Sequence, residues 1–287
     1  MNWEETIKYI RGVPEFKELV EKAYLEEDLQ LNVRRFRQSE EFKETLQIFE
    51  KSGFGKSVNI LDIGAGNGVA SVCFAMEGFN VTAVEPDSSN TVGNGAIKIL
   101  KDKYKLENIN VISSSGESIP LENEAYDIVY VRQAMHHANH LNDFLKEISR
   151  LLKKAGMLVA VREHVIFNEK DKQYFLKEHP LQKFYGGENA YTLIEYKQAI
   201  VNAGLTLIKT LKYFDSVINY FPLTMDEVLD MKAKRASIVN CGMKKHHLAS
   251  FQFTNPLIAY LYRIKLGKVY NERIVPGRMY SFIAIKK

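Results

Sequence analysis

Three glycines in a short turn, flanked by two acidic residues, form the part of this sequence with the clearest chemistry. Gly64, Gly66 and Gly68 follow an apolar run that contains Asp62. Glycine has no Cβ, so it adopts positive φ and lets a ligand approach the backbone closely. Glu85 follows a second apolar run about 20 residues later, where an acid can accept hydrogen bonds from ribose hydroxyls. The spacing therefore indicates a turn that binds a ligand with an adenosine part.

Two other kinds of glycine loop match this turn poorly. The dinucleotide fingerprint needs glycine or alanine at position 69, where this chain has Val69. The P-loop needs a Gly-Lys-Ser/Thr ending, which does not follow here. Asp62 would also repel a pyrophosphate, whereas it suits a ligand with positive charge. A nicotinamide-dependent oxidoreductase is therefore kept only as an alternative.

Histidines gather after two of the predicted strands, and a histidine can act as a general base near neutral pH. His136, His137 and His140 follow one strand, and His164 follows the next. We expect them at the carboxyl edge of the sheet, where open α/β folds bind ligands, and predict His137 and His164 as catalytic residues. A structural role is the other interpretation. His136 and His140 have a spacing that could suit a metal, but the Glu of an H-E-x-x-H motif is missing, so no metal site is predicted.

Two charged residues, Arg162 and Glu163, stand before His164. Polar and aromatic residues also gather in one glycine-containing loop, residues 179–191. Aromatic rings cover the apolar faces of a sugar, while amides and carboxylates bind its hydroxyls. We therefore predict that these residues bind the acceptor of a reaction. The alternatives are a salt bridge at the strand end and a packed structural loop. The predicted acceptor-binding residues are Arg162, Glu163, Tyr185, Glu188, Asn189 and Tyr191.

These side chains need a scaffold, and from residue 57 onward short apolar runs alternate with helical stretches. This order is typical of βαβ units and predicts a doubly wound α/β core with a parallel sheet. Between the last two runs, apolar residues from Phe144 to Leu152 share one helix face, and Gly156 is placed to end that helix. The core strands are predicted at Val58–Ile63, Asn80–Glu85, Ile109–Ile112, Tyr126–Arg132 and Met157–Val161.

Composition places few limits beyond those of an ordinary globular protein. The chain has 287 residues, 46% hydrophobic and 26% charged, and its two cysteines have no zinc-binding spacing. Acids near the N-terminus and the lack of an apolar run of ~18 residues argue against a signal peptide and a membrane span, so we expect a cytoplasmic protein. Residues 221–287 hold 12 Lys and Arg against 4 Asp and Glu. This basic segment could attract an anionic partner or form a solvated surface. Nucleic acid is not predicted as a partner, because no recognition module accompanies it.

Taken together, the motifs resemble those of class I S-adenosylmethionine-dependent methyltransferases. The stretch Leu61–Gly68 resembles the first motif of that family, and Glu85-Pro86-Asp87 resembles the second, which binds ribose. Residues 117–121 and 126–129 resemble the third and fourth strand regions. The stretches 132–137 and 151–158 are similar to the small-molecule, type 11 branch. The resemblance covers residues 57–165.

This resemblance implies S-adenosylmethionine as the cofactor, with S-adenosylhomocysteine as the product. It places Gly64, Ala65 and Gly66 against the cofactor, Asp62 near its amino-acid part and Glu85 at its ribose. The chain departs from the family at Ser115, where an acid often contacts the adenine amino group. The predicted cofactor-binding residues are Asp62, Gly64, Ala65, Gly66, Asn67, Glu85, Pro86, Ser115, Gly116, Glu117, Arg132 and Gln133.

The same resemblance implies a Rossmann-like, mostly parallel sheet of seven strands whose last strand is antiparallel. One domain is expected, because the sequence has no internal repeat and no linker rich in Gly and Pro. A helix is predicted near Leu193–Ala203 and a strand at Leu205–Tyr213. The predicted parts are a helical lid at 1–56, the cofactor-binding core at 57–165, acceptor-side loops with the sixth strand at 166–220, a helical insert at 221–270 and the last strand at 271–287.

The function expected from this resemblance is methyl transfer to a small or medium-sized acceptor by in-line displacement. An oxygen of a sugar, a phenol or a polyhydroxylated or anionic metabolite is favoured, since the Asn/Asp-Pro-Pro-Tyr/Phe motif of many amino-group methylating enzymes is missing at residues 132–134. The alternatives are a non-catalytic S-adenosylmethionine-binding regulatory protein and an NAD(P)-dependent oxidoreductase.

Overall fold

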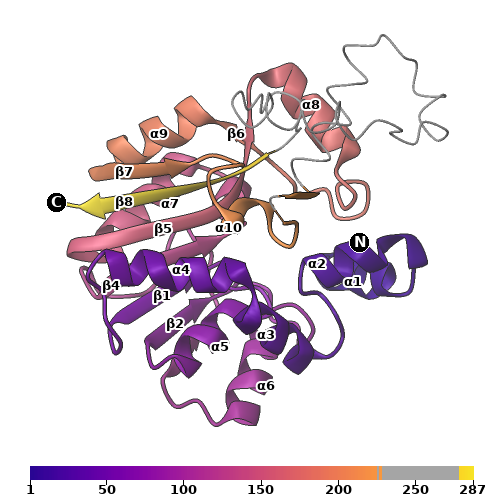
Figure 1. Ribbon diagram of the computed structural model, residues 1–287, viewed down its shortest axis with the longest axis horizontal. Helices are drawn as coiled ribbons and strands as arrows, with labels where there is room; N and C mark the ends of the chain where they lie inside the picture. The colour runs from indigo at the N-terminus through magenta and orange to yellow at the C-terminus, as the bar shows by residue number, and fades with distance from the viewer. Residues whose placement is uncertain (225, 228–277) are drawn as a thin grey trace.

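Eight strands form one mixed sheet in the computed structural model, which describes residues 1–224, 226–227 and 278–287 (Figure 1). Along the sheet the order is β3-β2-β1-β4-β5-β8-β7, and a short β6 pairs with β5. β8 runs antiparallel between β5 and β7, whereas the pairs from β3 to β5 are parallel. The mostly parallel sheet with an antiparallel last strand is thus confirmed, with the two-residue β6 added. The strands are β1 (Asn59–Ile63), β2 (Asn80–Val84), β3 (Ile109–Ile112), β4 (Tyr126–Arg132), β5 (Leu152–Ile166), β6 (Tyr191–Thr192), β7 (Leu205–Leu211) and β8 (Arg278–Lys286).

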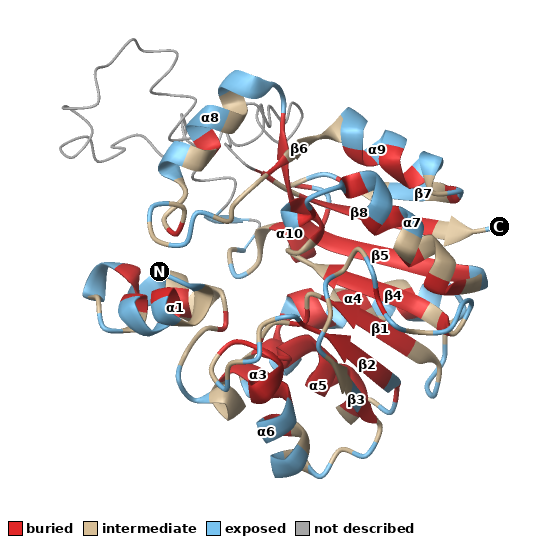
Figure 2. Ribbon diagram, turned by 180° about the vertical axis from the view of Figure 1, so that it is seen from behind, coloured by how far each residue is buried: buried red, intermediate tan, exposed pale blue. Residues whose placement is uncertain are grey.

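Helices cover both faces of this sheet, which explains why its central strands are apolar along their whole length. Ile60 and Ile128 face one hydrophobic cluster, together with side chains of α3, α4, α5 and α6. Leu61 and Val129, one residue further along each strand, face a second cluster with α7 and α9. Figure 2 shows the buried central strands between the two helical layers. The helices are α3 (Leu29–Gln38), α4 (Glu40–Lys51), α5 (Val69–Met76), α6 (Asn94–Tyr104), α7 (Leu141–Leu151) and α9 (Leu193–Asn202).

Of the predicted lid at 1–56, α3 and α4 pack with the sheet, whereas the first helices form a separate, smaller unit, which alone we call the lid. It consists of α1 (Trp3–Arg11), the 3-10 turn η1 (Pro14–Phe16) and α2 (Lys17–Lys22). Apolar lid residues pack with Val92 and with Leu181 of the 179–191 loop, in a cluster distinct from the two that line the sheet. The lid therefore joins the loop after β2 to the predicted acceptor loop.

Several boundaries differ from the prediction. The helix before β5 ends at Leu151, because Leu152 already pairs with Tyr126 as the first residue of β5. Gly156 therefore lies inside that strand, and the prediction that it ends the helix is wrong. β5 is also longer than the predicted Met157–Val161. Remaining elements are the 3-10 turn η2 (Met135–His137), α8 (Glu169–Glu178) and α10 (Val217–Tyr220).

α8 was not predicted, and its sequence explains why. Phe175 is its buried residue, so there is little apolar periodicity to detect. The predicted helical insert at 221–270 lies largely outside the described residues, as does the first part of the predicted last strand at 271–287. Among the described residues, no helix combines the length and the apolar character that crossing a bilayer requires.

Candidate functional site at the carboxyl edge of the sheet

The glycine turn lies between the carboxyl end of β1 and the start of α5. Gly64, Gly66 and Gly68 have φ of 71°, 55° and 80°, in the left-handed region that favours glycine. A Cβ on Gly64 would lie 2.4 Å from Cβ of Ala134, which follows β4. The backbone N–H groups of Gly64 and Ala65 both donate to the carbonyl of Val84, which fixes the turn to the end of β2. The turn therefore has the predicted form and is packed against the neighbouring strand end.

Asp62 and Glu85, the two predicted acids, lie beside this turn at the ends of adjacent parallel strands. The Asp62 carboxylate accepts a 2.5 Å hydrogen bond from Ser71 Oγ, and its burial raises its pKa to about 6. Glu85 accepts from the backbone N–H of Gly66 at 2.8 Å and of Asp87 at 2.9 Å, and burial raises its pKa to about 7. A carboxylate has about four acceptor sites, so Glu85 retains capacity for ligand hydroxyls.

Three more of the predicted cofactor residues hold the surrounding backbone together. Asn67 Nδ2 donates to the carbonyl of Tyr24 at 2.8 Å and so ties the glycine turn to the segment after α2. Glu117 accepts from the backbone N–H of Asn139 at 2.9 Å, and a Cβ on Gly116 would meet the Phe144 ring at 2.2 Å. Contacts of Pro86 and Ser115 with a cofactor remain predictions.

Arg132 and Arg162 share one buried carboxylate from α4. Arg132 donates from Nε and Nη2 to the two oxygens of Glu41, and Arg162 Nη1 lies 3.6 Å from the same group. Arg162 Nη1 also donates to the carbonyls of Ile218 and Phe221, at 2.7 and 2.9 Å. These contacts attach α4 and α10 to the sheet, so both guanidinium groups have a structural task. Gln133 beside them has φ of 52° and donates its N–H to Val161.

Glu163, predicted to bind an acceptor, instead anchors the turn after β4 from inside the protein. It is fully buried and accepts the backbone N–H groups of Ala134 and Met135 at 3.2 Å and of His136 at 2.9 Å. It also contacts Nδ1 of the His136 ring at 2.8 Å. Burial raises the pKa of Glu163 to about 7. The carboxylate thereby sets the orientation of the His136 imidazole.

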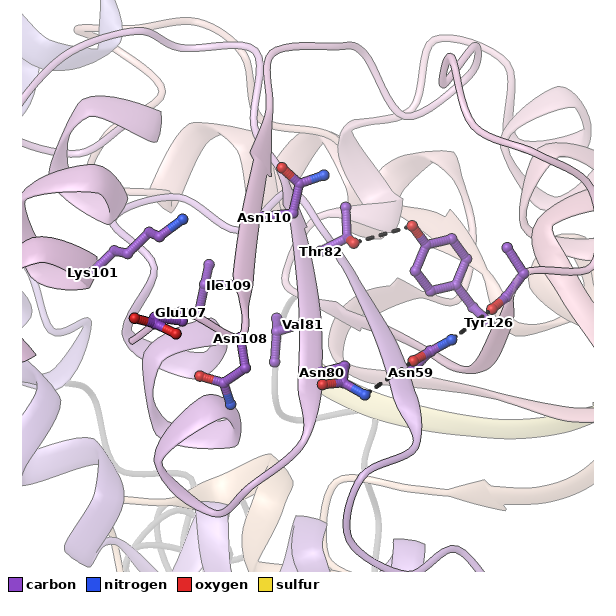
Figure 3. A pocket seen from close by; sticks show the side chains of 11 residues that line it. Asn59, Asn80, Val81, Thr82, Lys101, Glu107, Asn108, Ile109, Asn110 and Tyr126 are labelled. Carbon is purple, nitrogen blue, oxygen red and sulfur yellow. Dashed lines mark hydrogen bonds between the residues drawn. The ribbon is translucent and has the colours of Figure 1, made fainter. Parts of the chain in front are cut away.

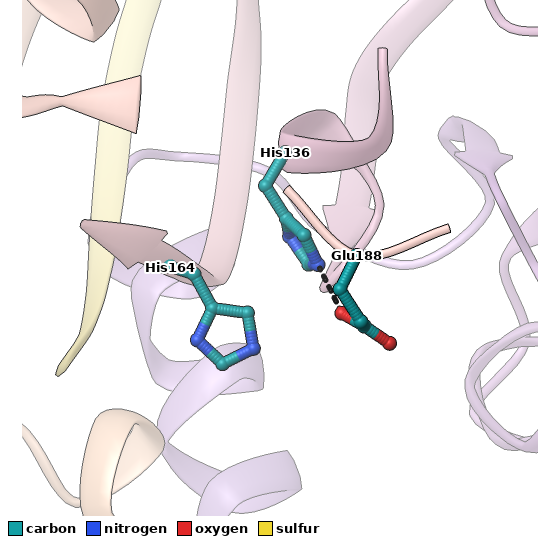
Figure 4. Close-up of side chains that lie close together, drawn as sticks. All are labelled: His136, His164 and Glu188. Carbon is teal, nitrogen blue, oxygen red and sulfur yellow. Dashed lines mark ion pairs between the residues drawn. The ribbon is translucent and has the colours of Figure 1, made fainter. Parts of the chain in front are cut away.

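Two side chains from distant segments, His164 and Glu188, lie close to that imidazole (Figure 4). His136 Nε2 lies 3.9 Å from Glu188 Oε2, and His179 Nδ1 lies 3.7 Å from Glu188 Oε1. The His164 ring is 4.7 Å from the His136 ring, centroid to centroid, and 5.9 Å from that of His179. We call His136, His164, His179 and Glu188 the histidine cluster.

The histidine cluster is mostly buried, and this shifts its titration. His136 and His164 are 1% and 7% exposed. Burial lowers the pKa of His136 well below its usual value, also lowers that of His179, and raises that of Glu188. His164 and Glu188 were predicted as site residues, but their partnership with His136 and His179 was not. The only sequence signal for it is histidine after two strands and again in the 179–191 loop.

Other predicted residues lie around the histidine cluster. His137 is exposed, its ring is 4.1 Å from that of His136, and its Nδ1 lies 2.8 Å from the carbonyl of Gly187. Tyr185 is 40% exposed and its ring packs 5.2 Å from that of Trp3 in the lid. The remaining two are Asn189, half-buried, and Tyr191, whose hydroxyl donates to the carbonyl of Ala138 at 2.7 Å.

A separate pocket lies at the opposite, amino edge of the sheet (Figure 3). It has a volume of about 480 Å³ and is lined by the first residues of four strands, Asn59, Asn80, Ile109 and Tyr126. None of the predicted site residues lines it. Parallel sheets bind ligands at their carboxyl edge, so we place the functional site there rather than in this pocket.

Comparison with known proteins finds methyltransferases. Residues 61–160 match the profile of a family described as a methyltransferase domain. An uncharacterized methyltransferase of Bacillus subtilis, YcgJ, is 28% identical over 102 residues, 36% of this chain and 39% of that protein. A ubiquinone biosynthesis O-methyltransferase of Rickettsia prowazekii is 31% identical over 103 residues, 36% of this chain and 38% of that protein. The chain therefore spans about two fifths of the length of these curated relatives.

The fold extends further than the sequence match. A structure of geranyl diphosphate methyltransferase in complex with S-adenosylmethionine has a TM-score of 0.56 and 14% sequence identity, and the match covers 85% of this chain and 84% of that one. At this identity the likeness concerns the fold. The likeness in fold therefore extends beyond residues 61–160.

Proposed function

We propose that this chain is an S-adenosylmethionine-dependent methyltransferase that transfers a methyl group to an oxygen of a small or medium-sized acceptor, and the match of residues 61–160 to a methyltransferase-domain profile supports this. The observation that carries the proposal is the pairing of Asp62 and Glu85 around the glycine turn. Both carboxyl groups end neighbouring parallel strands, and Glu85 contacts the turn itself through the Gly66 N–H at 2.8 Å. A sulfonium cofactor is positively charged, so acidic neighbours favour it over a pyrophosphate.

Methyl transfer asks mainly for alignment and the exclusion of water. S-adenosylmethionine supplies an electrophilic methyl group on a sulfonium when it is bound. Gly66, where a Cβ would meet only the Val92 carbonyl at 3.9 Å, would leave room for it, Glu85 would accept hydrogen bonds from its ribose, and Asp62 would lie on the side of its amino-acid part. The lid contacts both the loop after β2 and the 179–191 loop, so it can shield the reacting atoms.

An acceptor would lie over the carboxyl ends of β4 and β5. His137 is exposed there and its Nδ1 contacts the carbonyl of Gly187, which leaves Nε2 to take the proton of an acceptor hydroxyl. His164, the other predicted base, faces His136 inside the histidine cluster. Tyr185 and Asn189 add a ring and an amide of the kind that bind a polyhydroxylated molecule. A glycoside or a phenol is therefore the acceptor class we favour, and an O-methyltransferase name among the relatives is consistent with it.

Calorimetric titration with S-adenosylhomocysteine, with NADH as the rival ligand, tests the cofactor. We expect one-to-one binding of S-adenosylhomocysteine alone, weakened at least about tenfold by Glu85→Ala, since each lost charge-assisted hydrogen bond is worth about 1.5–3 kcal/mol. Binding of NADH alone, or unchanged affinity in both Glu85→Ala and Asp62→Ala, would contradict the site.

Release of S-adenosylhomocysteine in the presence of glycosides, phenols and amines then tests the acceptor. We expect turnover with a hydroxyl acceptor, and the mass and fragmentation of the product identify the methylated atom. His137→Ala should keep cofactor affinity and lose turnover. Turnover with amines only would contradict the proposed oxygen acceptor, and full activity of His137→Ala would remove its role as base.

A further inference from the structure

We propose that the histidine cluster is a binding site for a divalent transition metal of the zinc class, held by His136, His164 and Glu188. The ligand atoms of these three side chains all lie within 4.8 Å of one another (Figure 4). Two imidazoles and one carboxylate are a ligand set that zinc uses in catalytic sites. His179 stands beside Glu188 as a fourth donor.

The spacing of the donor atoms is slightly wider than a metal needs. Ligand atoms about 2.1 Å from a tetrahedral zinc ion are separated by roughly 3.4 Å. His136 Nε2 and Glu188 Oε2 are 3.9 Å apart, and the widest separation within the triad is at most 4.8 Å. The donors must therefore approach one another by roughly 0.5 to 1.4 Å. We expect rotation of side chains, chiefly that of Glu188, to supply this.

The hydrogen bonds around His136 favour a cation at this point. Glu163 already receives three backbone N–H groups, so it serves as the acceptor at Nδ1 and we assign the ring proton to Nδ1. The Nε2 lone pair then faces the Glu188 carboxylate at 3.9 Å, too far apart for a hydrogen bond. Two electron-pair donors that face each other in a buried site are stabilised by a positive ion between them.

Glu163 also has the position of a residue that tunes a metal ligand. Metal-binding histidines usually donate their second ring N–H to a carboxylate, which fixes the ring and raises its basicity. Glu163 makes this contact at 2.8 Å and is itself held by the turn after β4. The His179 Nδ1 atom is buried and has no hydrogen-bond partner among the described residues, which fits a donor that turns toward the ion.

The position of the site gives the metal a use. Ala134, in the turn that Glu163 holds, packs against Gly64 of the glycine turn, so the cluster adjoins the cofactor side. The three ligands His136, His164 and Glu188 leave one position on a tetrahedral ion, which His179 can fill and an acceptor oxygen can take in its place. This last step rests on the proposed function, whereas the metal site itself does not.

Titration of EDTA-treated protein with Zn²⁺ alone tests the site, with bound metal also measured by mass spectrometry. We expect one tightly bound ion per chain, and visible absorption typical of four-coordinate Co²⁺ when cobalt replaces zinc. Glu188→Gln and His164→Gln should each weaken the affinity about 100-fold or more, and Glu163→Gln about 10–100-fold. His140→Gln is the matched control, because His140 is exposed and lies outside the cluster.

Circular dichroism and denaturant unfolding show whether each variant has folded. If Glu163→Gln unfolds, its zinc affinity says nothing about the site. The comparison of zinc affinity between Glu188→Gln and His140→Gln then decides the proposal. Wild-type protein without stoichiometric Zn²⁺, or equal affinity in wild type, Glu188→Gln and His164→Gln, overturns the proposal. Because no acceptor or cofactor is present in the titration, its failure would leave the proposed methyl transfer untouched.

Discussion

The carboxyl edge of the sheet has two halves that are built in different ways. In the cofactor half, at β1 and β2, Glu85 binds the Gly66 N–H across 19 residues of sequence. In the acceptor half, at β4 and β5, His136 contacts Glu163, which is 27 residues away. It also lies near Glu188 of the 179–191 loop. A site made by two consecutive strand ends can be recognised as a motif, whereas a site made by three separate segments needs the fold to bring it together.

The two halves also differ in electrostatics. The carboxylates of the cofactor half accept hydrogen bonds from Ser71 or from backbone N–H groups nearby. In the histidine cluster, Nε2 of His136 and the Glu188 carboxylate face each other without a hydrogen bond. Burial raises the pKa of the acids in both halves, but only the acceptor half combines them with imidazoles. The cofactor half is thus prepared for hydroxyl and amino groups, and the acceptor half for a cation.

The largest effect is expected where the two halves touch, at Gly64. In Gly64→Ala the new Cβ would lie 2.4 Å from Cβ of Ala134, at a residue with φ of 71°. We expect the free energy of unfolding to fall by about 2–4 kcal/mol, as the sum of left-handed strain and overpacking. S-adenosylhomocysteine affinity should be lost as well. Denaturant unfolding and calorimetry measure the two effects.

Two further variants separate the causes of this loss. Gly53→Ala has comparable strain, with φ of 86°, but its Cβ meets nothing within 4 Å, so it should cost only about 1 kcal/mol. The double variant Gly64→Ala with Ala134→Gly removes the clash. It should recover most of the lost free energy of unfolding, except the part due to the left-handed backbone strain at residue 64. Equal losses in Gly53→Ala and Gly64→Ala would mean that contact between the halves contributes nothing.

The cofactor half could be predicted from sequence because its signals are local. Asp62, Gly64 and Glu85 each follow from one strand end or one turn, and the structure places all three together. The acceptor half depends on an irregularity of β5, where the register with β8 shifts between Ala160 and Glu163. Such bulges redirect the side chains that follow, and nothing in the apolar pattern announces them. This is why Arg162 and Glu163 were predicted at an acceptor but lie in the protein interior.

A second prediction concerns how the cofactor half responds to pH. Burial raises the pKa of Glu85 to about 7, above its unfolded value of about 4.5, so the folded protein binds more protons between these pH values. The contribution of Glu85 therefore lowers the free energy of unfolding as pH rises from about 4.5 to 7, by up to about 1.4 kcal/mol per pH unit. In Glu85→Gln the slope should be smaller by this contribution, while Asp62 and Glu163, whose pKa values burial also raises, keep theirs. Denaturant unfolding at several pH values measures the difference between the variant and the wild type.

Ligand binding sharpens this prediction. Ribose hydroxyls that donate to Glu85 stabilise its ionised form and lower its pKa, so saturating S-adenosylhomocysteine should flatten the slope of the wild type. The slope of Glu85→Gln should not respond. If, without ligand, the wild type and Glu85→Gln have the same slope, then Glu85 has the same pKa in the folded and the unfolded chain and the prediction fails.

The smallest effect is expected from the lid, which joins the two halves. Asn67 ties the segment after α2 to the glycine turn, while Phe184 of the acceptor loop packs against Tyr9 and Phe16 at ring distances of 5.2 and 5.8 Å. Phe184→Ala should therefore release the lid from the acceptor half only. The lid cluster is separate from the two that line the sheet, so we expect faster amide hydrogen exchange in residues 3–22 and little change in β1 or β4.

Tyr174→Ala is the matched control for this variant, since Tyr174 is an aromatic residue that is 50% exposed on α8. It should leave exchange in the lid unchanged. If Phe184→Ala accelerates exchange in β1 and β4 as much as in the lid, the lid unfolds together with the sheet and cannot open by itself. Faster exchange confined to residues 3–22 would mean that the acceptor half can be uncovered while Asn67 keeps the cofactor half closed. That order of opening would let an acceptor enter or leave while the cofactor stays bound.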